Sequence, residues 1–302
     1  MNPWTPLAAA TIGWASSAVL TRAVLVRGVG ALIVVPLRMT FAMAALLLVT
    51  AATGRFSTRS RRAWRRGVVL GVVGMSFPML LMTLALEDLP VSIGGLLIAL
   101  IPLATVGAAH FLVDGERFVL RSLPGLLLAL AGSAVLVGFG GNTIEGVGNL
   151  WKGVFLTVAG VLSAGIGGAL SRRFALEVPS DELVLPQFTV NWVVLLGLAP
   201  LLGAEQISGI DTVDWLLIAG IGVIGTTLPF ASFLIGAAVN PASRLALTGY
   251  SVPVLAVVLA VIFLGESLTL EIIVGAVMII GGVILAEKYG KHVPEPGVAT
   301  AR

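Results

Sequence analysis

The residues that could do chemistry in this chain are few, and Arg38 is the first of them. It stands inside the apolar stretch 30–51, whereas the other lysines and arginines fall near the ends of such stretches or between them. A guanidinium inside an apolar segment is costly and is a functional hypothesis by default. Its fork of donors could bind a substrate carboxylate. The alternative is structural, because Arg38 could extend toward Glu87 and Asp88 and pair with them.

A second group combines methionines, hydroxyls and aromatic rings at helical spacing. The run from Met75 to Thr83 follows the i, i+3, i+4, i+7 pattern of one helix face. Thioethers adapt to ligands of varied shape and hydroxyls fix orientation, so such a face could line a cavity. Ordinary helix packing is the alternative for each residue. The predicted substrate site comprises Trp14, Ser17, Met75, Ser76, Met79, Met82, Thr83, Thr227, Phe230, Tyr250 and Ser251. Trp14 and Tyr250 are the preferred walls, because each has a flat apolar surface with one polar atom.

Four prolines, Pro78, Pro102, Pro229 and Pro253, fall near the middle of apolar stretches. A proline inside a helix removes one backbone hydrogen bond and bends the helix. Lipid tolerates this only where neighbours or a water-filled cavity satisfy the freed carbonyl. We expect the four prolines to mark bending gates.

Several chemistries lack the residues they need. The chain has no cysteine and only two histidines, and no Asp or Glu falls at the centre of an apolar stretch. We find no Walker sequence, metal-ligand cluster or catalytic constellation. The sequence therefore predicts no enzyme activity, no cofactor and no metal, and it disfavours strongly cationic substrates. The net charge of +3 and the pI of about 9.8 reflect arginines at one membrane face rather than nucleic-acid binding.

The elements that must position these residues are membrane-spanning helices. The chain is 58% hydrophobic and 11% charged, with a mean hydropathy of +1.06, far from the balance of a soluble domain. A spanning helix needs roughly 20 apolar residues. The predicted spans are 4–24, 30–51, 67–86, 91–112, 118–138, 153–171, 185–202, 214–237, 242–263 and 269–286.

The distribution of arginine predicts the orientation of these spans. Six arginines lie between the second and third spans, at positions 55, 59, 61, 62, 65 and 66. The positive-inside rule places that segment, and with it both termini, in the cytoplasm.

The chain also contains its own sequence twice. The run Pro90-Val91-Ser92 recurs as Pro241-Ala242-Ser243, and Gly115-Glu116 recurs as Gly265-Glu266. Five spans per copy is an odd number, so the second copy enters the membrane from the opposite side, as in the inverted repeats of transporters. We expect an all-α integral membrane fold with repeats at 1–140 and 141–286 and a polar cytoplasmic tail at 287–302.

These motifs resemble the EamA-type exporters of the drug/metabolite transporter superfamily. The resemblance rests on "LIPLATVGAAHFLVDGERFVLRSLPGLLLALAGSAVLV" and "YSVPVLAVVLAVIFLGESLTLEIIVGAVMIIGGVILA", with Gly13-Trp14 and Arg38. It implies ten helices in a five-plus-five inverted repeat and export of small metabolites, with amino-acid exporters of the YddG type as the nearest members. It also implies that spans five and ten lie outside the core. Where the first copy has Trp14 and Arg38, the second has Ala164 and Phe188 or Thr189.

The sequence thus predicts a secondary exporter of small neutral or zwitterionic metabolites, aromatic or other apolar amino acids among them, working by alternating access. A drug or nucleotide-sugar carrier of the same fold is the alternative within transport, and a membrane enzyme or structural subunit is the alternative outside it. The expected setting is the bilayer of a bacterial inner membrane, with the protein as a monomer or weak homodimer and no nucleic-acid partner.

Overall fold

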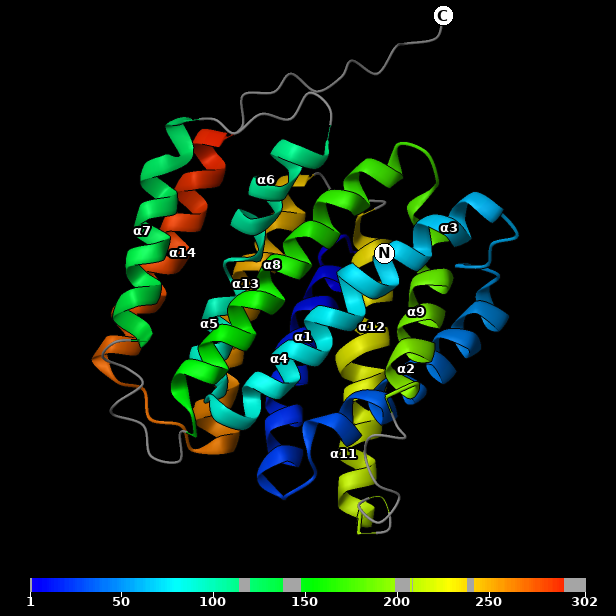
Figure 1. Ribbon diagram of the computed structural model, residues 1–302, viewed down its shortest axis with the longest axis horizontal. Coiled ribbons are helices and arrows are strands. Elements are labelled where there is room, and N and C mark those ends of the chain that lie inside the picture. Colours follow the sequence, from blue (N-terminus) through cyan, green and yellow to red (C-terminus); the bar gives the residue numbers. More distant parts are fainter. Residues whose placement is uncertain are drawn as a thin grey trace, which may run out of the picture.

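The computed structural model describes residues 2–113, 120–137, 148–198, 207, 209–237 and 242–290, and the regular structure in these ranges is entirely helical (Figure 1). The described residues form ten helical spans. The first repeat contains α1 (Trp4–Val26), α2 (Ala31–Thr53), α3 (Arg61–Val69) with η1 (Leu70–Ser76) and α4 (Phe77–Asp88), α5 (Val91–Ile98) with α6 (Ile101–Leu112), and η2 (Leu120–Ser122) with α7 (Leu123–Val135). The second contains α8 (Leu150–Ala175), α9 (Ser180–Leu196), α11 (Thr212–Gly222) with η5 (Val223–Thr227) and α12 (Leu228–Ala237), α13 (Ala242–Leu264) and α14 (Leu270–Gly290). The predicted all-helical fold is confirmed, and six of the spans are long and apolar enough to cross a bilayer by length and composition.

Two of the predicted starts are wrong for the same reason. The third span begins at Arg61 rather than at residue 67, because the Ser60 side chain caps the helix by accepting the Ala63 N–H. The seventh begins at Ser180 rather than at residue 185, because Asp181 and Glu182 favour a first helical turn. In both places polar residues form the start of a helix rather than a loop. Similarly, α14 continues to Gly290, so the predicted tail from residue 287 begins inside a helix.

The helices α7 and α14 pack on each other at one edge of the molecule (Figure 1). A Cβ added at Gly125 would lie 2.2 Å from the Ala286 nitrogen, and one added at Gly132 would lie 2.6 Å from the Met278 Cβ. The glycines therefore allow the two backbones to approach closely, which is how helices associate in lipid. Gly125 faces Ala286 and Gly132 faces Met278, so the two helices run antiparallel. They are spans five and ten, which the resemblance implied to lie outside the core.

The third span of each repeat, which contains the π-helical segment η1 or η5, packs on the first two helices of the other repeat. A Cβ at Gly222 would lie 2.5 Å from the Arg38 carbonyl oxygen of α2, and one at Gly71 would lie 2.9 Å from the Gln187 carbonyl oxygen of α9. In the same way η1 packs on α8 and η5 packs on α1. The two repeats therefore interlock through equivalent contacts.

The repeated Gly-Glu turn has a structural role in the second copy. Gly265 adopts a left-handed backbone with φ +67°, which glycine tolerates best. The Glu266 carboxylate accepts the N–H groups of Val91 and Ser92 at 2.7 and 2.9 Å. A carboxylate of one repeat thus caps the first turn of α5 in the other. Gly115 and Glu116 of the first copy lie outside the described residues.

Candidate substrate site

Two π-helical segments occupy equivalent places in the two repeats. η1 ends at Ser76, two residues before Pro78, and η5 ends at Thr227, two residues before Pro229. Each proline lacks the N–H that would bond the carbonyl four residues earlier. Each segment instead adopts a wider turn, in which the Phe77 N–H donates to the Val72 carbonyl and the Leu228 N–H donates to the Val223 carbonyl. Such bulges occur frequently at functional sites.

A hydroxyl side chain satisfies a backbone carbonyl in each bulge. Ser76 Oγ donates to the Gly71 carbonyl at 2.8 Å, and Thr226 Oγ1 donates to the Ile221 carbonyl at 2.9 Å. The two prolines are 151 residues apart, whereas these donors and acceptors are 150 apart, so the second repeat forms the same kind of bond one residue earlier relative to its proline. The polar surroundings of the two hydroxyls then differ.

Beside the second repeat's bulge lies Arg38, which is only 8% exposed. Its Nη2 donates to Ser17 Oγ at 3.2 Å and to Thr226 Oγ1 at 3.0 Å, and its Nε is buried with no hydrogen-bond partner. Within the described ranges, no carboxylate lies within ion-pair distance of it. The arrangement is a buried cation held by neutral hydroxyls, with donor capacity left over for an anionic group.

The interpretation that Arg38 extends to Glu87 and Asp88 is wrong. The Glu87 side chain accepts the Ala31 N–H at 2.7 Å at the start of α2, and Asp88 pairs with Lys152 at 2.6 Å. Arg38 lies seven residues further along α2, about 10 Å deeper. Both carboxylates are therefore engaged at the helix ends while Arg38 stays inside.

Beside the first repeat's bulge the equivalent space is neutral. Asn191 of α9 is fully buried, its Oδ1 accepts from Ser76 Oγ at 3.0 Å, and its amide nitrogen contacts the sulfurs of Met39 and Met79 at 3.3 and 3.8 Å. Neighbouring helices therefore supply the partners of the Asn191 side chain.

Aromatic rings flank the two polar clusters. Trp14 of α1 lies 5.4 Å from Phe233 between ring centroids, and Phe188 of α9 lies 5.3 Å from Phe230. Phe230, Met75 and Met79 are half-buried against the core formed by α2 and α9. The structure thus brings together the predicted residues Trp14, Ser17, Arg38, Met75, Ser76, Met79, Thr227 and Phe230 around the two bulges.

The remaining predicted residues lie elsewhere. Met82 packs toward Gly160 of α8, and the buried Thr83 hydroxyl donates to the Met79 carbonyl of its own helix. Tyr250 packs against the core that joins α5, α7 and α14. The helical periodicity placed these side chains on a common stripe, but neighbouring helices cover different parts of it.

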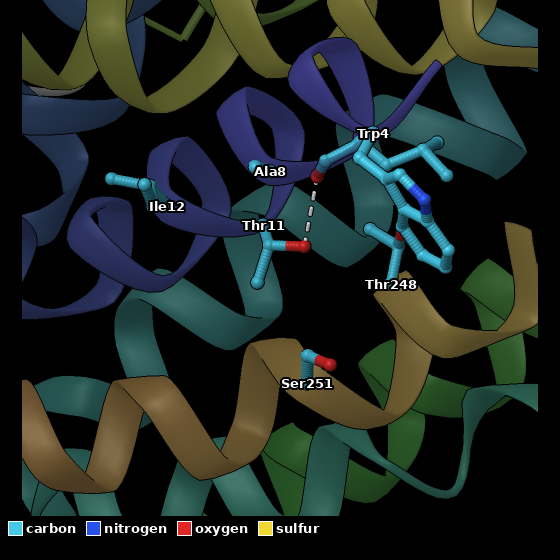
Figure 2. Close-up of a pocket in the computed structure, with 7 residues that line it drawn as sticks. Trp4, Ala8, Thr11, Ile12, Thr248 and Ser251 are labelled. Atoms are coloured by element: carbon cyan, nitrogen blue, oxygen red, sulfur yellow. Dashed lines mark hydrogen bonds between the residues drawn. The ribbon is translucent and has the colours of Figure 1, made fainter. Parts of the chain in front are cut away.

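Ser251 lines a separate cleft between α1 and α13, shown in Figure 2. The cleft has a volume of about 290 Å³. The Thr11 hydroxyl on its wall bonds back to the Leu7 carbonyl at 2.9 Å. Its lining consists of Trp4, Leu7, Ala8, Thr11, Ile12, Thr248 and Ser251.

The four prolines have three different backbone contexts. Pro78 and Pro229 follow the π-bulges. Pro102 follows a helix break at Ala99 and Leu100, between α5 and α6, whereas Pro253 lies inside the continuous helix α13. Their role as gates stays a prediction.

The site prediction omits Thr226, which holds Arg38. The available signal was a pair of adjacent hydroxyl residues, Thr226 and Thr227, just before a mid-span proline. Thr227 instead donates to the Ala42 carbonyl of α2 at 2.7 Å. Which of the two faces the arginine depends on the bulge, and helical periodicity does not include a bulge.

The arrangement of ten helices in two interlocked repeats with polar bulges at their interface is that of a membrane transporter. The model of the EamA-like transporter family matches residues 6–138 and again 151–287, so the chain belongs to this family of the drug/metabolite transporter superfamily.

Several curated proteins are similar to it. The aromatic amino acid exporter YddG of Ancylobacter novellus is 26% identical over 67% of this chain and 69% of its own length. A probable terminal-alkyne amino-acid exporter of Streptantibioticus cattleyicolor is 29% identical over 83% of this chain and 82% of its own. The uncharacterized transporter YvbV of Bacillus subtilis is 26% identical over 82% of this chain and 79% of its own. A crystal structure covering 98% of the chain matches with a TM-score of 0.67 at 21% identity, which supports the fold alone.

Proposed function

We propose that this transporter exports small zwitterionic metabolites with an apolar side chain, amino acids first among them, and that Arg38 receives the substrate carboxylate. The observation that carries the proposal is the buried guanidinium with an unpartnered Nε and no carboxylate beside it within the described residues. A carboxylate supplied by the substrate would complete its hydrogen bonds and neutralise its charge.

The surroundings of Arg38 fit the rest of such a substrate. Ser17 is three residues after Trp14 on α1, so both lie on one face of the helix. The Trp14 ring packs beside Phe233 and the Phe230 ring packs beside Phe188, and these rings would provide the apolar wall of the site. Two of the similar curated proteins are described as amino-acid exporters, which supports the same substrate class.

The mechanism we propose is alternating access of the two repeats. Each bulged span packs on the helices of the opposite repeat, so a rocking motion would move both bulges together around the site. The arginine-rich end would face the cytoplasm of a bacterial cell, with both termini there. The working unit would be a monomer or a weak homodimer.

The test is a counterflow assay with the purified protein in liposomes, with and without an imposed proton gradient. Phenylalanine and phenethylamine form a matched pair of probes, because the amine lacks only the carboxylate. We expect counterflow of phenylalanine and not of phenethylamine. Transport of the amine alone would favour a carrier of cationic drugs and would refute the role of Arg38. A folded protein that moves no amino acid would refute the proposed function.

A further inference from the structure

Outside the site just described, the densest run of charge in the described part of the chain lies on α3. This helix is at the end of the molecule opposite the start of α11 (Figure 1). A groove of about 760 Å³ is lined by Arg61, Arg62, Arg65, Arg66, Val69 and Glu177. We refer to it as the arginine groove. Four guanidinium groups surround one carboxylate, so the groove carries an excess of positive charge.

The sequence places these arginines so that they repel one another. Arg61 and Arg65, like Arg62 and Arg66, are four residues apart on one helix face, where like charges destabilise a helix. Arg66 is compensated, because it bonds both carboxylate oxygens of Glu177 and lies 4.5 Å from the Phe174 ring centroid. The side chains of Arg61, Arg62 and Arg65 form no ion pair with any residue in the described ranges.

The apolar residues beside the arginines indicate the kind of anion. Val68 and Val69 are 45% and 39% exposed, one turn after Arg65, and Trp64 is 37% exposed. A span that changes from exposed arginine to exposed valine within one turn, with a tryptophan one turn before Val68, lies at the boundary between headgroups and acyl chains. A soluble anion would use only the arginines, whereas a lipid would use both parts.

We propose that the arginine groove binds the phosphodiester headgroup of an anionic phospholipid. Arg61, Arg62 and Arg65 supply the donors, Val69 contacts the upper acyl chain, and Arg66 stays bonded to Glu177. Guanidinium forks match phosphate oxygens in a bidentate manner. The bound lipid would relieve the repulsion along α3, the helix that continues into the first bulge. The proposal is independent of the transported substrate.

The test is native mass spectrometry of the full chain in detergent with added phosphatidylglycerol or phosphatidylcholine. The variant Arg62→Gln/Arg65→Gln removes two groove charges. Its matched control, Arg55→Gln/Arg59→Gln, removes two exposed charges from the preceding segment. At about 1 kcal/mol per arginine near a charged lipid, the groove variant should bind phosphatidylglycerol roughly 30-fold more weakly. The control should bind it as the wild type does.

Other outcomes overturn the proposal. Equal losses in both variants would mean general attraction to a basic end, and no loss in either would mean no lipid site. If inorganic phosphate displaced phosphatidylglycerol from the wild type, the groove would be a site for soluble anions. Because glutamine removes charges that orient the chain, Arg62→Lys/Arg65→Lys is made in parallel. It keeps the charge, loses the fork, and should weaken lipid binding several-fold while Arg55→Lys/Arg59→Lys does not.

Discussion

The segment before Pro78 and the segment before Pro229 contain the same helix distortion but contact different partners. Both are π-bulges in which a hydroxyl donates to a carbonyl five residues earlier. Thr226 in the second repeat also holds Arg38, whereas Ser76 in the first also holds Asn191. The shared part of the two bulges is therefore backbone chemistry imposed by proline. The part that differs is a charge on one side of the molecule and an amide on the other.

A similar comparison holds for two of the ion-paired groups that join the repeats. Arg27 follows α1 and bonds Asp211 and Asp214 at the start of α11. Glu177 follows α8, 150 residues later, and bonds Arg66 at the start of the third span. The same ionic contact therefore occurs in both repeats, but the arginine and the carboxylate exchange places. The exchange keeps the arginines of the third span at their own end, consistent with the asymmetry of charge across a membrane.

The largest expected effect comes from removing the charge that distinguishes the two bulges. Arg38→Gln should lower phenylalanine counterflow by about 30-fold or more, because a buried charged hydrogen-bonded pair is worth about 2 kcal/mol or more. Arg38→Lys should retain part of the activity, since it keeps the charge without the fork. Unchanged counterflow in Arg38→Gln would show that the two clusters do not differ in substrate binding.

The amide of the other cluster should contribute to stability instead. Asn191→Ala leaves the Ser76 hydroxyl without one of its partners and opens a small cavity, at a cost of about 1–3 kcal/mol in unfolding free energy. The melting temperature in detergent should fall, while the KM for phenylalanine should stay near the wild-type value. A raised KM with an unchanged melting temperature would place Asn191 in the substrate site.

The two bulge hydroxyls provide a matched pair of variants. Ser76→Ala and Thr226→Val each remove one hydrogen bond to a backbone carbonyl and should each cost about 1 kcal/mol of stability. Thr226→Val also removes one of the two acceptors of Arg38 Nη2, leaving only Ser17, and should in addition lower counterflow several-fold. Equal effects of the two variants on transport would contradict the difference between the clusters.

The ion pair at the end of α1 should have the smallest effect. The backbone N–H of Asp214, with help from Arg27, holds the pKa of Asp211 below its ordinary value of 3.8. A lowered pKa in the folded state means that the contribution is present above pH 4 and is lost as the pH falls below that value. The difference in melting temperature between wild type and Asp211→Asn should therefore be smaller at pH 3.5 than at pH 7. Exposed ion pairs contribute little to stability because water and salt screen them, so Arg66→Gln should be equally mild. A large fall in melting temperature in either variant would mean that these ion pairs hold the repeats together.

Much of the fold follows from short-range patterns in the chain. Apolar length predicts the ten spans, the duplicated Gly-Glu and proline residues predict two repeats, and glycines at 125, 132, 275 and 282 fit the crossing of α7 and α14. The starts at Arg61 and Ser180 were missed because polar residues can begin a helix as well as end one. The site was predicted only in part, because periodicity describes one helix and a site is formed by several.

The sequence by itself determined the class of protein, the repeat and the presence of one arginine inside a span, because hydropathy, duplication and charge are properties of the chain read along its length. Only the tertiary structure decided what Arg38 contacts. Glu87 accepts a hydrogen bond at the start of α2, and Asp88 pairs with Lys152 near the start of α8. The bulge turns Thr226 rather than Thr227 toward the guanidinium. The physical reason is that burial removes water as a partner. Each polar group must then bond whatever another helix brings within reach, and that depends on packing between segments up to 188 residues apart.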